Sequence, residues 1–302
     1  MANSIVSDIK QNIKNGNPVT RLIIFNVCVF LFLSIFRILV FFSGSAPAVA
    51  SLQDFLIRNL SVHFNIAGLL QKPWTLLTFM FSHFDFPQLL WNMLSLYLFG
   101  KILSDYTSAK KIIPLYIYGG IAGALIATLL ITIIPGFHFY SENLLSGASA
   151  SVTAIIVAAA TLVPKVKLNL ILIGPVKLVY LALFFILIDI LNLASYANLG
   201  GNLSHLGGAL MGYLFIVQYK KGKDMATPFN RFFDWISGLF KGSSKSKMKV
   251  IHKRNLTDEE YNYNKTVNQK QLDAILDKIS KSGYESLSKT EKEMLFRESG
   301  RK

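Results

Sequence analysis

Two residues of this chain could serve as the nucleophile and the general base of a hydrolase, and both lie in strongly apolar stretches. Ser149 follows Gly147 and Ala148 at the predicted start of one apolar helix, and His205 lies inside another. A serine hydroxyl becomes an effective nucleophile when a nearby base accepts its proton. An ionisable side chain inside a membrane-spanning segment is costly and usually functional. Together the two residues predict serine-hydrolase chemistry within a membrane.

Small residues near both positions predict that the two helices can approach closely. Gly208 and Gly212 follow His205 on one helix face, and glycine faces let helix backbones pack together in membranes. If the helix that begins near Gly147 lies against this face, His205 can reach Ser149. Taken alone, Ser149 also fits a small-residue packing face, and His205 also fits a proton relay or a buried hydrogen-bond partner. The combination of the two favours a catalytic pair.

A third group of polar residues could stabilise the negative charge that develops on a substrate carbonyl oxygen. Gln88 and Asn92 are spaced i, i+4 on one predicted helix face, and His83 lies just before that helix. Side-chain amides donate hydrogen bonds, and the amide of Ser149, at a helix N-terminus, would add another donor. Gly147 would let a substrate carbonyl approach the backbone closely. The alternative for Gln88 is that it only caps the helix or reaches toward the membrane surface.

The composition predicts that these elements belong to a polytopic membrane protein. Of the 302 residues, 52% are hydrophobic, and the mean hydropathy is +0.43. A hydrocarbon core about 30 Å thick takes roughly 20 helical residues to cross. The expected fold class is all-α, a bundle of six transmembrane helices. The six predicted spans are 21–43, 88–106, 111–134, 147–163, 176–193 and 201–219.

The distribution of lysine and arginine predicts the topology. By the positive-inside rule both termini lie in the cytoplasm and the long 44–87 loop lies outside. The net charge of +14 then reflects topology. No basic-aromatic nucleic-acid module is visible, so no nucleic-acid partner is predicted. The basic residues assigned to the cytoplasmic side are Lys10, Lys14, Arg21, Lys101, Lys110, Lys111, Lys165, Lys167, Lys177, Lys220, Lys221 and Lys223.

The chain is predicted to divide into four segments. A polar cytoplasmic leader (1–20) precedes the six-span domain (21–220). An amphipathic juxtamembrane segment with a basic linker (221–255) follows, and its aromatic stretch suits the surface of the cytoplasmic leaflet. The last segment (256–302) is a small helical cytoplasmic tail.

Within the tail, the spacing of apolar residues predicts two helices. Leu272, Ile275 and Ile279 belong to an amphipathic stripe, which Gly283 ends. The second helix begins at a capping box, because Ser288 is followed three residues later by glutamate.

Two features lie before or within the fifth predicted span. Residues 164–177 are predicted to form an interfacial turn. Asp189, near the end of that span, has two interpretations: an end residue that reaches toward the membrane surface, or a polar contact to a neighbouring helix.

The motifs together resemble those of the rhomboid intramembrane serine proteases. The shared features are six spans with cytoplasmic ends, the G-x-S motif at Ser149, the H-x-x-G-x-x-x-G run from His205 and the run from His83 to Asn92. The resemblance covers about residues 20–220. It implies a bacterial-type serine endopeptidase that cleaves transmembrane segments near the external face. It further implies Ser149 as nucleophile, His205 as base without an acidic third member, and Asn92 as an oxyanion donor.

This chain departs from the family pattern at four positions. Gln88 stands where the family often has histidine, and Thr75 stands where it often has arginine. Ala150 stands where glycine often follows the serine, and Thr153 stands where the family often has an aromatic residue that supports the base. The resemblance implies transmembrane protein substrates, contact with membrane lipids and a location in the bacterial inner membrane. No metal, cofactor or oligomeric state is predicted, since the spans offer neither paired haem ligands nor a zinc ligand set.

Two alternatives stay open. One is a catalytically inactive rhomboid-like protein that binds and routes membrane clients. The other is a small transporter or channel, which would need more charged or broken helices at mid-depth.

Overall fold

A computed structural model describes residues 16–42, 46–170, 174–194, 198–240 and 258–299. The chain divides into two compact units, 1–242 and 243–302, and each is described by itself. Most of the predicted leader (1–15) and the basic linker (241–255) lie outside the described residues.

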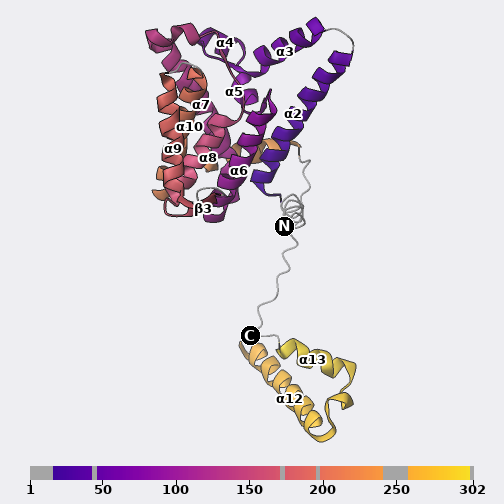
Figure 1. Cartoon of the computed structure of the whole chain (residues 1–302). Helices are drawn as coiled ribbons and strands as arrows, with labels where there is room; N and C mark the ends of the chain where they lie inside the picture. The colour runs from indigo at the N-terminus through magenta and orange to yellow at the C-terminus, as the bar shows by residue number, and fades with distance from the viewer. Residues whose placement is uncertain (1–15, 43–45, 171–173, 195–197, 241–257, 300–302) are drawn as a thin grey trace. The chain divides into compact units, whose positions relative to one another are not determined.

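The first unit is a bundle of helices (Figure 1). A helix occupies each of the six apolar stretches. By length and composition, two helical stretches in the described part of the chain could cross a membrane, Pro18–Phe42 and Ala109–Ile133. The six helices are α2 (Pro18–Phe42), α6 (Phe86–Tyr106), α7 (Ile112–Ile133), α8 (Ser149–Leu162), α9 (Leu178–Leu193) and α10 (Leu199–Lys220).

Glycines bring the backbones of α8 and α10 into direct contact, as the sequence predicts. A Cβ atom on Gly208 would lie 2.2 Å from the carbonyl oxygen of Ala150. One on Gly212 would lie 2.1 Å from the carbonyl oxygen of Ala154. No side chain fits at either position, so the two glycines fix how closely the helices approach.

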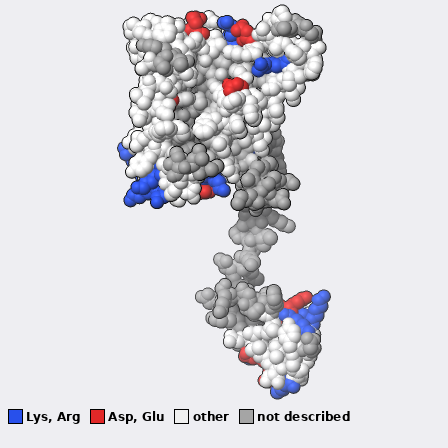
Figure 2. All heavy atoms as spheres, viewed as in Figure 1, with Lys and Arg blue, Asp and Glu red and all other residues white. Residues whose placement is uncertain are grey.

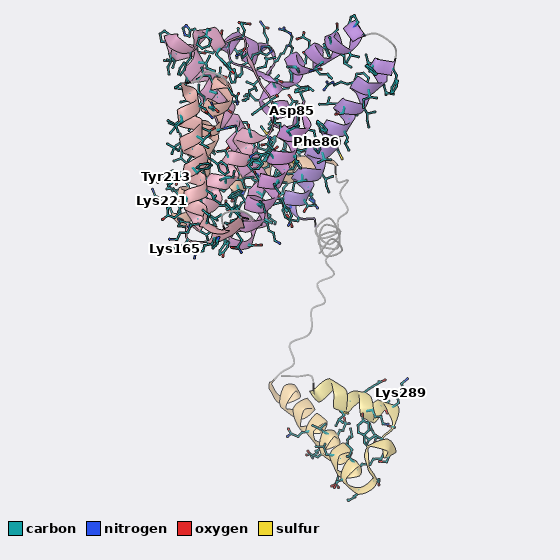
Figure 3. The ribbon with its side chains drawn as sticks, viewed as in Figure 1. Asp85, Phe86, Lys165, Tyr213, Lys221 and Lys289 are labelled. Carbon is teal, nitrogen blue, oxygen red and sulfur yellow. The ribbon has the colours of Figure 1, made fainter. Side chains whose placement is uncertain are left out.

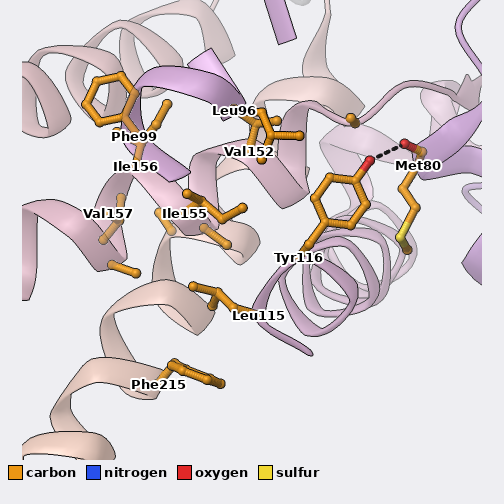
Figure 4. Packing of buried hydrophobic residues seen from close by; sticks show 14 of the residues in the cluster. Met80, Leu96, Phe99, Leu115, Tyr116, Val152, Ile155, Ile156, Val157 and Phe215 are labelled. Carbon is orange, nitrogen blue, oxygen red and sulfur yellow. Dashed lines mark hydrogen bonds between the residues drawn. The ribbon is translucent and has the colours of Figure 1, made fainter. Parts of the chain in front are cut away.

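Apolar side chains fill the space around this contact (Figure 4). Leu96 of α6, Leu115 of α7 and Ile155 of α8 are fully buried. Within this core the Tyr116 hydroxyl donates a hydrogen bond of 2.7 Å to the Met80 carbonyl. The bond fastens the segment before α6 onto α7.

The long segment between α2 and α6 contains short elements that reach the start of α8. Its strand β1 pairs antiparallel with β2, with Val62 opposite Leu145 and His63 opposite Leu144. The pairing places this segment beside the residues that lead into α8. The elements of this segment are α3 (Ala46–Leu60), β1 (Val62–His63), α4 (Ile66–Gln71), α5 (Thr75–Thr78) and η1 (Phe79–Phe81). Between α7 and α8 lie η3 (Pro135–Tyr140) and β2 (Leu144–Leu145).

The segment 164–177, predicted as an interfacial turn, contains a pair of strands that the prediction missed. Strand β3 (Lys167–Leu170) pairs antiparallel with β4 (Gly174–Lys177). The alternation of polar and apolar residues in β3 gives the strand one half-buried face. The described residues contain four short strands and are otherwise mostly helical, consistent with the expected all-α class.

Positive charge gathers at the end of the first unit where this hairpin lies (Figure 2). Lys165 and Lys221 both lie there (Figure 3). Asp85 is on the part of the bundle nearer the opposite end. We call the end with Lys165 and Lys221 the basic end.

Helix α11 (Ala226–Phe240) follows α10 and contacts the start of α7. The Phe229 ring meets the Tyr118 ring edge-on, with centroids 5.8 Å apart. The buried Lys111 ammonium, in η2 (Ala109–Lys111), forms an ion pair with Asp224. The amphipathic stretch is therefore a helix attached to the bundle.

The second unit contains α12 (Asp258–Ser282), η4 (Tyr284–Ser286) and α13 (Lys289–Ser299). Gly283 has φ of +74° and follows the last residue of α12, which confirms the predicted helix end. The Ser288 N–H donates to Glu291 Oε2 at 2.7 Å, and the Glu291 N–H donates to Ser288 Oγ at 3.3 Å. The predicted capping box is therefore confirmed.

Candidate active site

Ser149 is the first residue of α8, as its small neighbours predict. The two preceding N–H groups are used: Gly147 donates to the Phe79 carbonyl at 2.8 Å, and Ala148 donates to His83 Nε2 at 3.2 Å. Gly147 has φ of +95°, a conformation that favours glycine. Because Val152 is the first residue whose N–H reaches back to Ala148, the Ser149 N–H lies among the free donors of the first turn.

His83 links the start of α8 to α6. Its Nε2 accepts hydrogen bonds from the Ala148 N–H and from Asn92 Nδ2, the latter at 3.1 Å. An Nε2 that accepts must carry no proton. Burial lowers the pKa of His83 to about 4, so the ring is neutral at physiological pH. His83 is therefore a fixed acceptor that holds Asn92 beside Ala148.

Gln88 lies on the other side of the same turn. Asp85 caps α6 by accepting the Gln88 N–H at 2.8 Å, which sets Gln88 in the first turn. The Gln88 side chain donates to the Ser146 carbonyl at 3.3 Å. A Cβ on Gly147 would lie 2.9 Å from the Gln88 side-chain amide. The structure thus brings Gln88, Asn92 and His83 to the residues that precede Ser149.

His205 lies on α10, one turn before the glycine that touches Ala150. From His205 to the end of α10 at Lys220 is about 22 Å, and from Ser149 to the end of α8 at Leu162 is about 20 Å. Both helices end on the side of the basic end. The two residues therefore lie at similar depths on neighbouring helices.

His205 also has a partner on α9. Its Nδ1 is 2.8 Å from Asp189 Oδ1, and the carboxylate is buried. Of the two interpretations of Asp189, the structure therefore supports the polar contact to a neighbouring helix. One signal in the sequence favours this contact: Asp189 lies shortly before the end of α9 and His205 shortly after the start of α10, so the antiparallel pair brings them to one level.

Among the described residues, Ser149 Oγ has no hydrogen bond to His205. The His205 side chain is 20% exposed, and Ser149 is half-buried. Both side chains are therefore partly accessible. Catalytic hydrogen bonds are often long without substrate and tighten in the complex. The Thr153 hydroxyl donates to the Ser149 carbonyl at 2.8 Å, so it is bound to α8 itself.

An apolar cavity of about 500 Å³ opens between α6 and α9. Trp91, next to Asn92, lines it from α6, and Phe184 and Phe185 line it from α9. Leu168 lines it from the hairpin. Within the described residues, no group of three or more His, Cys, Asp or Glu side chains could hold a metal ion.

Comparison with known proteins gives two family matches and one relative. A family described as "Rhomboid domain" matches residues 70–221, half of the chain. A "family of unknown function" matches residues 256–301 in the second unit. The relative is "RHOMBOID-like protein 12, mitochondrial" of Arabidopsis thaliana, 27% identical over 225 residues. The match covers 70% of this chain and 61% of that protein.

Proposed function

This chain belongs to the rhomboid family and is an integral membrane protein, and we propose that it is an intramembrane serine endopeptidase. The observation that carries the proposal is the contact between Gly208 and Ala150, which holds the helices of His205 and Ser149 together. Ser149 is the first residue of α8, and His205 lies at a similar depth on α10.

The chemistry follows from these positions. His205 Nε2 accepts the Ser149 hydroxyl proton as Oγ attacks the substrate carbonyl carbon, forming a C–O bond and an oxyanion. The protonated imidazole then gives its proton to the leaving amide nitrogen as the C–N bond breaks. Water, deprotonated by His205, hydrolyses the acyl-enzyme and regenerates Ser149.

The oxyanion would be stabilised by donors around the start of α8. The Ser149 N–H is free, and the Asn92 amide has a second hydrogen beyond the one used on His83. Gln88 has the same capacity, because its amide donates one hydrogen to the Ser146 carbonyl. We infer that Asn92 and Gln88 both serve this purpose.

The proposed substrates are transmembrane segments of other membrane proteins. Apolar side chains from α6 and α9, among them Trp91 and Phe184, line the cavity. Such a lining suits an apolar peptide segment and not a charged small molecule. We propose cleavage near the external face, because α8 is only about 20 Å long and Ser149 lies at the end away from the basic end.

The proposed topology has six spans with both termini in the cytoplasm of a bacterium. The gathering of lysines at the basic end supports this orientation. Single cysteines at Ser51 and Lys223, in a Cys28→Ser background, test it. An impermeant thiol reagent added to intact cells should label position 51 and not position 223. Labelling at position 223 would reject the topology.

The tail (256–302) is proposed to be separate from the chemistry, because it belongs to the second compact unit. A chain truncated after residue 242 should keep its active-site reactivity. Loss of reactivity in a truncated protein that still inserts stably would reject this part of the proposal.

The decisive experiment asks whether Ser149 reacts as an activated nucleophile. Purified protein in detergent is incubated with a fluorophosphonate probe and with a single-span substrate. We expect labelling and cleavage that Ser149→Ala abolishes and His205→Ala reduces by orders of magnitude. The matched control is Ser151→Ala, two residues along α8. A stably folded wild-type protein that neither labels nor cleaves would favour the inactive, client-binding alternative.

A further inference from the structure

The carboxylate of Asp189 is the single charged group in α9, in the sequence from Leu178 to Leu193. It is 8% exposed, within an otherwise apolar helix. An ionisable group in such a place is costly unless it is paired. Its partner is His205, with 2.8 Å between Oδ1 and Nδ1.

This contact determines which nitrogen of His205 is free. An ionised carboxylate only accepts hydrogen bonds, so the proton of a neutral His205 must be on Nδ1. Nε2 then has its lone pair exposed, which is the form that can take a proton from a serine hydroxyl. The bond also fixes the rotation of the His205 ring, whose side chain is one-fifth exposed.

The Asp189 carboxylate also opposes the charge that appears during the reaction. When Nε2 takes the Ser149 proton, the imidazole becomes positive. A carboxylate at hydrogen-bond distance stabilises that cation, and more strongly in a partly buried site than in water. The stabilisation applies when the ring is charged, so it lowers the barrier more than it strengthens substrate binding.

We propose that Asp189 is a positioning residue for His205, so that this chain uses a Ser149–His205–Asp189 triad where the family resemblance implies a dyad. The inference rests on the proposed function, because it names a further residue of the same site. The carboxylate acts on Ser149 only through the imidazole of His205.

A purely structural role makes a different prediction. The same contact joins α9 to α10, and α9 is also one wall of the apolar cavity. If Asp189 only clasped the two helices, its loss would alter the entry of a large substrate. A small electrophile that Ser149 attacks directly would then react at the normal rate or faster.

The test compares Asp189→Asn, Asp189→Glu and Asp189→Ala in the full-length protein, with Ile190→Ala as the control on the exposed side of α9. Two rates are measured on monodisperse protein: fluorophosphonate labelling, and cleavage of a single-span substrate with kcat and KM separated. Asparagine has the size of aspartate, which keeps the fold, but it can favour the wrong tautomer of His205.

We expect Asp189→Asn and Asp189→Ala to lower both the labelling rate and kcat by about 10²- to 10⁴-fold with little change in KM. Asp189→Glu should recover part of the rate, and Ile190→Ala should match the wild type. Normal labelling in Asp189→Asn, or a change confined to KM, would overturn the positioning role while leaving the proposed function intact. If Ser149→Ala still labels, the proposed function fails, and the triad fails with it.

Discussion

The substitution Gly208→Ala tests whether the contact between α8 and α10 sets the distance from His205 to Ser149. The added Cβ would lie 2.2 Å from the Ala150 carbonyl oxygen, which is backbone and cannot rotate away. The helices would have to separate by about 1 Å to restore an ordinary contact. Overpacking of this kind costs about 1–3 kcal/mol of folding free energy.

The effect on activity should exceed the effect on stability. His205 lies one turn from Gly208, so a local separation of about 1 Å moves the base away from the nucleophile by nearly that distance. Misplacement of about 1 Å can cost about 100-fold in rate. We therefore expect the labelling rate of folded Gly208→Ala protein to fall about 100-fold.

Two glycine variants serve as controls. Gly212→Ala introduces a similar clash, 2.1 Å from the Ala154 carbonyl oxygen, but one turn farther from His205. It should lose similar stability and less activity. Gly136→Ala has open space around the new Cβ and should match the wild type. The labelling rate and the melting temperature are measured together for each protein. Equal losses of activity in Gly208→Ala and Gly212→Ala would refute the argument that Gly208 sets the catalytic distance.

Three further predictions follow from individual side chains. Gln88→Leu should lower kcat by about 10²–10³-fold, whereas Gln88→His should keep most activity, because leucine cannot donate to an oxyanion; full activity in the leucine variant would leave only a capping role. Burial lowers the pKa of His83 from 6.5 to about 4, so between these pH values the unfolded chain binds a proton that the folded chain does not. The melting temperature should therefore decrease as the pH falls from about 6.5 to 4. A His83→Gln variant with the same pH dependence of the melting temperature would contradict this. The hydrogen bond from the Ser288 N–H lowers the pKa of Glu291 to about 2. The stability that this bond gives the start of α13 should therefore be present above about pH 4.5 and decline below it. Hydrogen exchange of the Ser288 amide should show this decline, and Glu291→Gln should abolish its pH dependence.

The positions of the main helices could be predicted from the sequence because they depend on local composition. Long apolar runs decide where α2 and α7 lie. Asp85, Gly283 and the pair Ser288–Glu291 mark helix ends by local conformation and hydrogen bonding. Such signals need no knowledge of the tertiary structure. The close contact at Gly208 was also predictable, because glycines on one face of an apolar helix permit it.

The hairpin and the partner of Asp189 depend on information that the local sequence lacks. Strands β3 and β4 are four residues each, and lysine and proline within them resemble a turn. The Asp189 contact depends on how α9 and α10 are rotated about their axes. That rotation is set by packing across the whole bundle, so the sequence alone left two interpretations.

Two of the helices that hold the proposed site, α6 and α10, have weaker apolar character than α2. Helices α6 and α10 contain 21 and 22 residues, about 31 and 33 Å, which is enough to cross a hydrocarbon core. Neither meets the length and hydropathy criterion that α2 meets. Asn92 and His205, with the glycines that admit close contact, reduce the apolarity of these helices. Since the polar groups face the bundle interior, their cost is offset by hydrogen bonds such as Asn92–His83 and His205–Asp189. The lower apolarity of α6 and α10 therefore reflects the polar residues and glycines that they contribute to the proposed site, whereas the strongly apolar α2 contributes none.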